Sequence, residues 1–188
     1  MEQTTRAPRR EGSLAKTRTL TKMALCVALL GISAYISFPL PFTPAMVTAL
    51  TIVVNLIAFI LKPHEAFLAL LAWMILGAVG VPVFVGGTAG LGKLIGPTGG
   101  FIVSFLVAGW LMSKLRGNAT SFKTLSLLGI FVGMPVIYVG GCISMYVVAH
   151  LSVWATLVAA VFPFIFGDVV KVLIAAFLAS RIHKMMHD

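Results

Sequence analysis

Two residues of opposite charge, Asp168 and Lys171, lie in an otherwise apolar segment near the end of the chain, "PFIFGDVVKVLIAAFLASRIHK". Residues three apart share one face of a helix, so a helix here would place the carboxylate beside the ammonium group. A charged side chain in a membrane-spanning helix costs about 2.5–3.5 kcal/mol and usually faces the bundle interior at a functional site. The spacing therefore predicts a pair that binds a polar ligand. The alternative is an ion pair that only fixes the register of this helix.

A glycine-rich stretch, "GGTAGLGKLIGPTGG" at residues 86–100, is the second candidate. Glycine allows positive φ and lets the backbone approach a ligand closely. Irregular backbone at membrane depth is tolerated where it is buried in protein or lines a cavity. We therefore predict that this loop covers the charged pair, the alternative being a flexible outer turn. Its candidate ligand contacts are Gly86, Gly87, Gly90, Lys93 and Thr98.

The same loop matches part of a phosphate-binding motif, G-x-x-x-x-G-K, from Gly87 to Lys93. That motif needs Ser or Thr after the lysine to hold magnesium and joins a strand to a helix. Leu94 follows here, between apolar segments, so we interpret the match as chance. The sequence also has no acidic metal cluster and no nucleophile motif. We therefore expect binding without catalysis, no cofactor and no metal; a membrane-embedded enzyme or a structural membrane protein is the alternative.

One amide and three aromatic residues are further candidates for the site. Asn55 is the only amide in an apolar segment, and it either forms a hydrogen bond between helices or contacts a ligand. Phe101, Tyr138 and Tyr146 either line an outward-facing pocket or belong to the aromatic belt at the membrane interface. Both interpretations remain open from the sequence.

Small residues spaced by four form strips that allow close approach of helices in lipid. Ala24 and Ala28 form one strip, and Gly129 and Gly133 form another. Each strip serves either packing within the bundle or docking against another membrane protein.

The elements that hold these residues are predicted from composition. Sixty per cent of the 188 residues are hydrophobic and 10% are charged, against about 25% charged in soluble domains. Helices of about 20 apolar residues cross a membrane. We therefore predict an all-α integral membrane protein with six spans, and a short helix at 153–162 on the outer face. The spans are expected near residues 20–38, 46–62, 65–83, 99–115, 124–148 and 163–183.

The net charge of +9 is distributed in a way that predicts orientation rather than nucleic-acid binding. Basic residues cluster at alternate junctions between apolar segments, which is typical of cytoplasmic loops. Both termini should be cytoplasmic, with a basic, mobile tail at 1–18 and a membrane domain at 19–188. The residues assigned to the cytoplasmic side are Arg6, Arg9, Arg10, Lys16, Arg18, Lys22, Lys62, Lys114, Arg116, Lys123, Arg181 and Lys184.

Three stretches carry a resemblance to a known family: "LGAVGVPVFVGG" (76–87), "GLGKLIGPTGGF" (90–101) and "GDVVK" (167–171). They closely resemble the BioY family, the biotin-binding S components of energy-coupling-factor (ECF) transporters. The resemblance implies a six-helix S-component fold in a prokaryotic cell membrane, with an outward pocket closed by the loops after spans 1 and 3. It also implies biotin as the ligand, and a transmembrane T subunit and two cytoplasmic ABC-type ATPases as partners.

The resemblance also implies roles for individual residues. Asp168 would accept a hydrogen bond from a ureido N–H of biotin. Lys171 would either neutralise Asp168 or lie near the biotin carboxylate, for which Lys93 is a second candidate. Ala24 and Ala28 would contact the T subunit.

Two positions depart from the family pattern. Phe101 stands where the family usually has tyrosine, and a glutamine often found after the first loop is missing from "PAMVTALT" (44–51). Either change alters the affinity for biotin, or the chain is an S component for a different vitamin.

Overall fold

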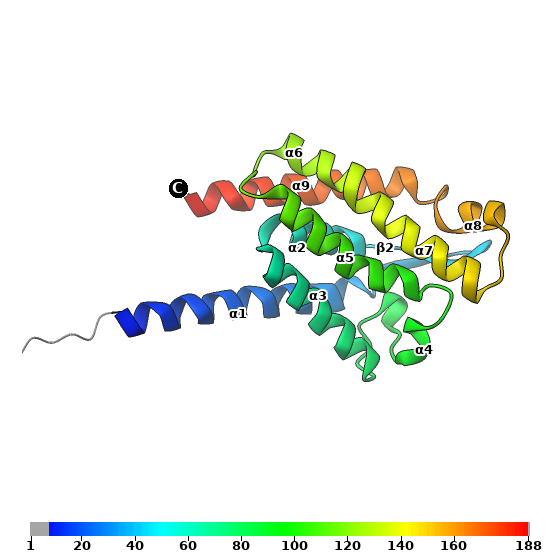
Figure 1. Cartoon of the computed structure of the whole chain (residues 1–188), viewed down its shortest axis with the longest axis horizontal. Helices are drawn as coiled ribbons and strands as arrows, with labels where there is room; N and C mark the ends of the chain where they lie inside the picture. The colour runs from blue at the N-terminus through cyan, green and yellow to red at the C-terminus, as the bar shows by residue number, and fades with distance from the viewer. Residues whose placement is uncertain (1–7, 188) are drawn as a thin grey trace, which may run out of the picture.

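The structure, a computed structural model, describes residues 8–187 of the chain. It is mainly helical, with one β-hairpin (Figure 1). The helices are α1 (Pro8–Ser33), α2 (Leu50–Ile60), α3 (Pro63–Ala78), α4 (Leu91–Leu94), α5 (Gly99–Arg116), α6 (Phe122–Leu128), α7 (Met134–Val148), α8 (Val153–Ala160) and α9 (Ile165–His187). The strands are β1 (Ser37–Leu40) and β2 (Thr43–Thr48); η1 (Val85–Gly87) is a 3₁₀ turn and η2 (Gly129–Gly133) a π-helical turn.

Helix α5 occupies the centre of the bundle and packs against α7, α3 and α2, while α2 also packs against α9. The contact between α5 and α7 is close because glycines face each other. At Gly100 a Cβ atom would collide with the Gly140 carbonyl, and at Gly141 it would collide with the ring of Phe101. This close packing places Phe101 of α5 beside α7, the helix that carries Tyr138.

The C-terminal end of α2 is held by side chains from α5 and α9. Ser113 Oγ donates to the Leu61 carbonyl at 2.7 Å, and Arg116 Nη2 donates to the same oxygen at 3.2 Å. His183 Nε2 lies 2.7 Å from the Phe59 carbonyl, which can only accept, so this nitrogen carries the proton. These bonds satisfy carbonyls that a helix end leaves unpaired, and they fix α2 between the two helices.

The first predicted span, residues 20–38, runs past the end of helix α1. Helix α1 begins at Pro8, so residues 8–18 are helical where a polar tail was expected; residues 1–7 lie outside the described part of the chain. The helix ends at Ser33, because Pro39 and the prolines that follow it cannot donate within a helix. The chain instead forms the antiparallel β1–β2 hairpin, which joins α8 through a 2.7 Å bond from Thr43 Oγ1 to the Ala159 carbonyl.

Several other spans differ from their predicted lengths. Helix α2 has only 11 residues because strand β2 occupies residues 43–48, and α3 ends at Ala78, shortly before Gly80 at φ +111°. Within residues 8–187, the 27-residue helix Phe122–Val148 is long and apolar enough to cross a membrane, and α8 with α9, bent by 43°, is a second such segment only when the two are counted as one span. The short helix expected at 153–162 is confirmed as α8.

Candidate ligand-binding site

A cavity lies where the hairpin, the glycine loop and helices α2, α5, α7 and α9 meet. It comprises about 720 Å³ of space, part of it open to solvent. Most of its lining is apolar, with a few polar groups, as in typical small-molecule sites. The lining residues are Pro44, Ala45, Met46, Thr48, Thr51, Val85, Lys93, Thr98, Phe101, Ile102, Phe105, Ile137, Tyr138, Phe164, Asp168 and Lys171.

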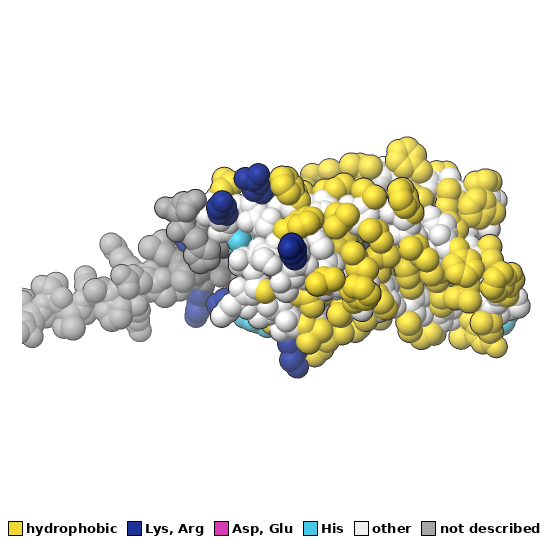
Figure 2. Space-filling view, turned by 90° about the horizontal axis from the view of Figure 1, so that it is seen from above, with side chains coloured by type: hydrophobic (Ala, Val, Ile, Leu, Met, Phe, Trp, Pro, Cys, Tyr) yellow, Lys and Arg dark blue, Asp and Glu magenta, His cyan; other side chains and the backbone are white. Residues whose placement is uncertain are grey.

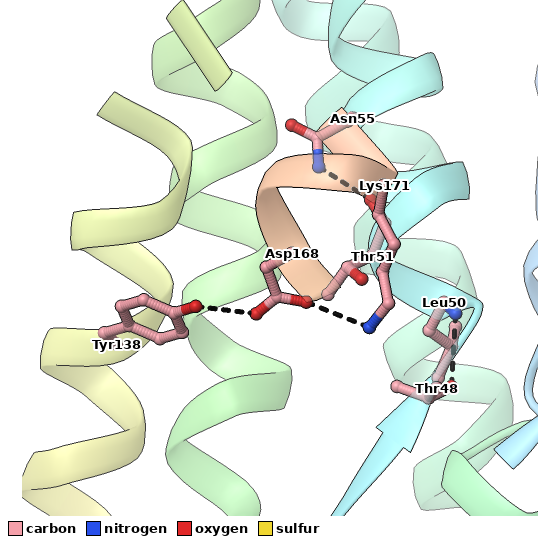
Figure 3. A network of polar contacts seen from close by, with 7 residues as sticks. All are labelled: Thr48, Leu50, Thr51, Asn55, Tyr138, Asp168 and Lys171. Atoms are coloured by element: carbon pink, nitrogen blue, oxygen red, sulfur yellow. Dashed lines mark hydrogen bonds and ion pairs between the residues drawn. The ribbon is translucent and has the colours of Figure 1, made fainter. Parts of the chain in front are cut away.

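The polar centre of this cavity is Asp168, which is 8% exposed. Its Oδ1 accepts from Lys171 Nζ at 2.9 Å, and its Oδ2 accepts from Tyr138 Oη at 2.8 Å, so both carboxylate oxygens are engaged from opposite sides (Figure 3). Asp168 lies in the first turn of α9, where the helix dipole stabilises a negative charge. Each carboxylate oxygen still has a free lone pair for a ligand donor.

Two polar residues of the glycine loop line another part of the same cavity. Lys93 belongs to the four-residue helix α4, and Thr98 immediately precedes α5. Lys93 is half-buried, and its ammonium group has no hydrogen-bond or ion-pair partner in the part of the chain that the structure describes. The two cations of the cavity therefore differ: Lys171 is paired with Asp168, and Lys93 is free to pair with an anion.

The glycine loop is held in place by its backbone. Gly86 and Gly87 adopt φ of +73° and +69°, and the Gly86 N–H donates to the Ala34 carbonyl at 2.9 Å. Gly90, at φ +96°, donates to the Gly77 carbonyl at 2.7 Å. These three glycines do not line the cavity themselves; they position Val85 and Lys93, which do.

Two predicted site residues lie away from the cavity. Tyr146 is 53% exposed and lies in a shallow apolar groove between α7 and α8. Asn55 is 2% exposed and bonds within its own helix, from Nδ2 to the Thr51 carbonyl at 2.7 Å. Its Oδ1 has no partner among the described residues and faces the turn that contains Gly129 and Gly133. Asn55 therefore belongs to the packing between α2 and η2.

The sequence analysis did not identify the threonines of the hairpin and α2. Thr48 Oγ1 accepts from the Leu50 N–H at 3.1 Å and so satisfies the first backbone donor of α2. Thr51 is buried beside Lys171, and its hydroxyl has no partner among the described residues (Figure 3). Thr48 ends strand β2 and Thr51 lies in the first turn of α2, so their proximity to the cavity follows from the hairpin and has no signal in the local sequence.

The strip of Ala24 and Ala28 is exposed on the surface of α1. Neighbouring Leu25 and Leu29 are also exposed. The strip is therefore not buried within the part of the bundle that the structure describes.

Comparison with known proteins identifies both the fold and the family. The chain aligns with a crystal structure of the S component for biotin from an ECF-type ABC transporter, with a TM-score of 0.85 over 90% of this chain and 93% of that one, at 21% identity. The fold is thus that of an S component. The BioY family model matches residues 4–188, and the chain belongs to the BioY family.

Curated relatives agree over nearly the whole chain. The biotin transporter BioY2 of Lactococcus lactis subsp. cremoris is 34% identical over 174 residues, covering 92% of this chain and 94% of the relative. A probable biotin transporter BioY of Pyrococcus horikoshii is 33% identical over 89% of this chain and 97% of its own length.

Proposed function

We propose that this chain is the substrate-binding S component of an ECF transporter and captures biotin from outside the cell. The observation that carries the proposal is the buried Asp168–Lys171 pair in a largely apolar cavity of a BioY-family chain. The chain itself catalyses no reaction in this account and needs no cofactor; ATP is used by partner subunits.

The cavity offers groups that match biotin in kind. The apolar wall of Phe101, Phe105 and Phe164 suits the fused bicycle, and the free lone pairs of Asp168 suit the two ureido N–H donors. Tyr138 holds the carboxylate from the side opposite Lys171. The pair is thus oriented before the ligand arrives, which reduces the ordering cost of binding.

The biotin carboxylate has two candidate partners, and the contacts favour Lys93. Lys171 already pairs with Asp168 at 2.9 Å, whereas Lys93 has no counterion among the described residues. An apolar cavity strengthens attraction between opposite charges because the local dielectric is low. We therefore assign the carboxylate to Lys93 and the ureido group to Asp168.

The proposal includes six membrane crossings with both termini in the cytoplasm. The start of α1 and the end of α9 lie at the same end of the bundle (Figure 1). Asp168 lies 13 residues before Arg181 on α9, roughly 20 Å along the helix axis. The basic end then faces the cytoplasm, and the cavity lies on the outer half of the bundle.

The proposed partners are a transmembrane T subunit and two cytoplasmic ABC-type ATPases, with Ala24 and Ala28 as the contact with the T subunit. The exposure of both alanines supports this assignment. We expect Ala28→Trp to leave biotin binding unchanged and to abolish biotin uptake by cells, because a large side chain prevents close approach. Leu25→Trp, at an exposed position beside the strip, is the matched control. Normal uptake by the Ala28→Trp variant would contradict the assignment.

Isothermal titration of the purified protein with biotin tests the central proposal. We expect saturable binding of one biotin per chain, and no binding of vitamins that lack a ureido group. Saturable binding of another vitamin, with none of biotin, would assign the same fold to a different ligand.

A further inference from the structure

Basic residues gather at one end of the molecule, and hydrophobic side chains cover the rest of the face shown (Figure 2). At this end, Glu65 is the one acid whose side chain the structure describes. The described basic residues there are Lys16, Arg18, Lys22, Lys62, Lys114, Arg116, Lys123, Arg181 and Lys184.

Two of these cations lie at the ends of strips of exposed apolar residues. One strip is on α5 and the other is on α9. On α5, Val103, Val107 and Trp110 are exposed and precede Lys114, whose Nζ lies 4.9 Å from the Trp110 ring centre. All four residues share the outward face of the helix because their spacing is i, i+4, i+7 and i+11.

The strip on α9 has the same spacing and the same order of residue types. Val170, Ile174 and Phe177 are exposed and precede Arg181, whose Cζ lies 5.3 Å from the Phe177 ring centre. Each strip is about 16 Å long at 1.5 Å per residue, which is about half of a 30 Å hydrocarbon core. Each therefore matches one leaflet of a bilayer, with the cation at its surface.

We propose that the two strips bind individual anionic phospholipids, with the acyl chain along the apolar residues and the phosphate on Lys114 or Arg181. Neither cation pairs with a carboxylate in the part of the chain that the structure describes. The charged group of each lies over an aromatic ring of the strip, which holds it at the apolar boundary. This inference rests on the proposed membrane placement and is independent of the ligand in the cavity.

A lipid fits these strips better than a free phosphate or an acidic protein surface. Free phosphate has no apolar part and would gain nothing from Val103 and Val107. A protein partner would not require the same spacing twice, on α5 and on α9, with leaflet length in both. Anionic lipids of the cytoplasmic leaflet attract Lys and Arg with about 1 kcal/mol each.

Fluorescence of Trp110 tests the proposal, in vesicles of brominated phosphatidylglycerol or brominated phosphatidylcholine. A Trp154→Phe background removes the other exposed tryptophan, and Trp73 is buried. We expect phosphatidylglycerol to bind beside Trp110 about fivefold more tightly than phosphatidylcholine. The preference should disappear in Lys114→Gln and persist in Lys62→Gln, a control that removes the same charge at the same end.

Native mass spectrometry in detergent tests the α9 strip in the same way. Arg181→Gln should lose one phosphatidylglycerol adduct that the unchanged protein and Lys62→Gln retain.

Equal quenching by both lipids, or a preference that survives Lys114→Gln, would overturn the proposal and leave the strips to a protein partner. Inorganic phosphate, added at the same concentration as the lipid headgroups, should not remove the preference for phosphatidylglycerol. If it does, the site binds free anions, and the proposal is overturned as well. No quenching by either lipid would overturn the membrane placement, while biotin titration in detergent tests the ligand separately.

Discussion

Replacing Asp168 by asparagine removes one charge from the centre of the site while preserving the shape of the side chain. In the structure, Lys171 Nζ and Tyr138 Oη donate to its two oxygens at 2.9 and 2.8 Å. A carboxylate keeps further lone pairs on both oxygens, whereas asparagine presents an NH₂ donor on one side. That donor would face Tyr138, Lys171 or a ureido N–H, all of which are donors here.

The expected loss follows from the bond that disappears. A hydrogen bond to a charged group contributes about 1.5–3 kcal/mol, so biotin should bind roughly tenfold to a hundredfold more weakly. The comparison is an isothermal titration of both proteins in the same detergent. Glu65→Gln removes an equal charge outside the cavity and should leave the affinity unchanged.

A second variant separates lost binding from lost stability. Asp168→Asn leaves Lys171, whose side chain is 13% exposed, without its counterion, and an unpaired charge that is largely buried is destabilising. Lys171→Met in the Asp168→Asn background should restore the thermal unfolding midpoint but not the affinity for biotin. A folded Asp168→Asn protein that binds biotin as tightly as the unchanged chain would refute the assignment of this residue to the ligand.

The other predictions concern the loop and the bundle interior. Lys93→Gln should weaken the binding of biotin by about tenfold, because one ion pair is lost, and should leave the binding of biotin methyl ester unchanged. Equal losses of affinity for the two ligands in parallel titrations would exclude a contact between Lys93 and the carboxylate. Gly87→Ala should lower the thermal unfolding midpoint more than Gly92→Ala, because Gly87 has φ +69° and its Cβ would stand 2.7 Å from Cε1 of Tyr35, while the Cβ of Gly92 meets nothing within 4 Å; equal midpoints would contradict this. Asn55→Leu should keep or raise stability, by up to about 1 kcal/mol, because it removes a buried acceptor without a partner; a lowered free energy of unfolding would reveal a partner for Oδ1.

The polar centre of the site was predictable because its signal is local. Asp168 and Lys171 are conspicuous in an apolar segment, and three residues of helix bring them together without help from other elements. The glycine loop was predictable for a similar reason, since repeated glycine indicates positive φ, found at Gly86, Gly87 and Gly90.

Features that depend on several elements were not predictable from the sequence. The hairpin over residues 37–48 has short strands and contains three prolines, one of them in its turn, so its pattern differs little from that of a loop. The π turn at Gly129–Gly133 inserts into the helix before α7 and so changes the direction in which the side chains of α7 point. No local sequence pattern predicts this turn. Tyr138 and Tyr146 therefore appear equivalent in the sequence, yet the first bonds to Asp168 and the second lies outside the cavity.

The most direct measurement is an experimental structure of the chain with biotin bound. We expect the bicycle to lie between Phe101 and Phe164, with a ureido nitrogen within about 3.2 Å of a carboxylate oxygen of Asp168. Biotin bound elsewhere, or Asp168 and Lys171 turned toward the lipid, would contradict it.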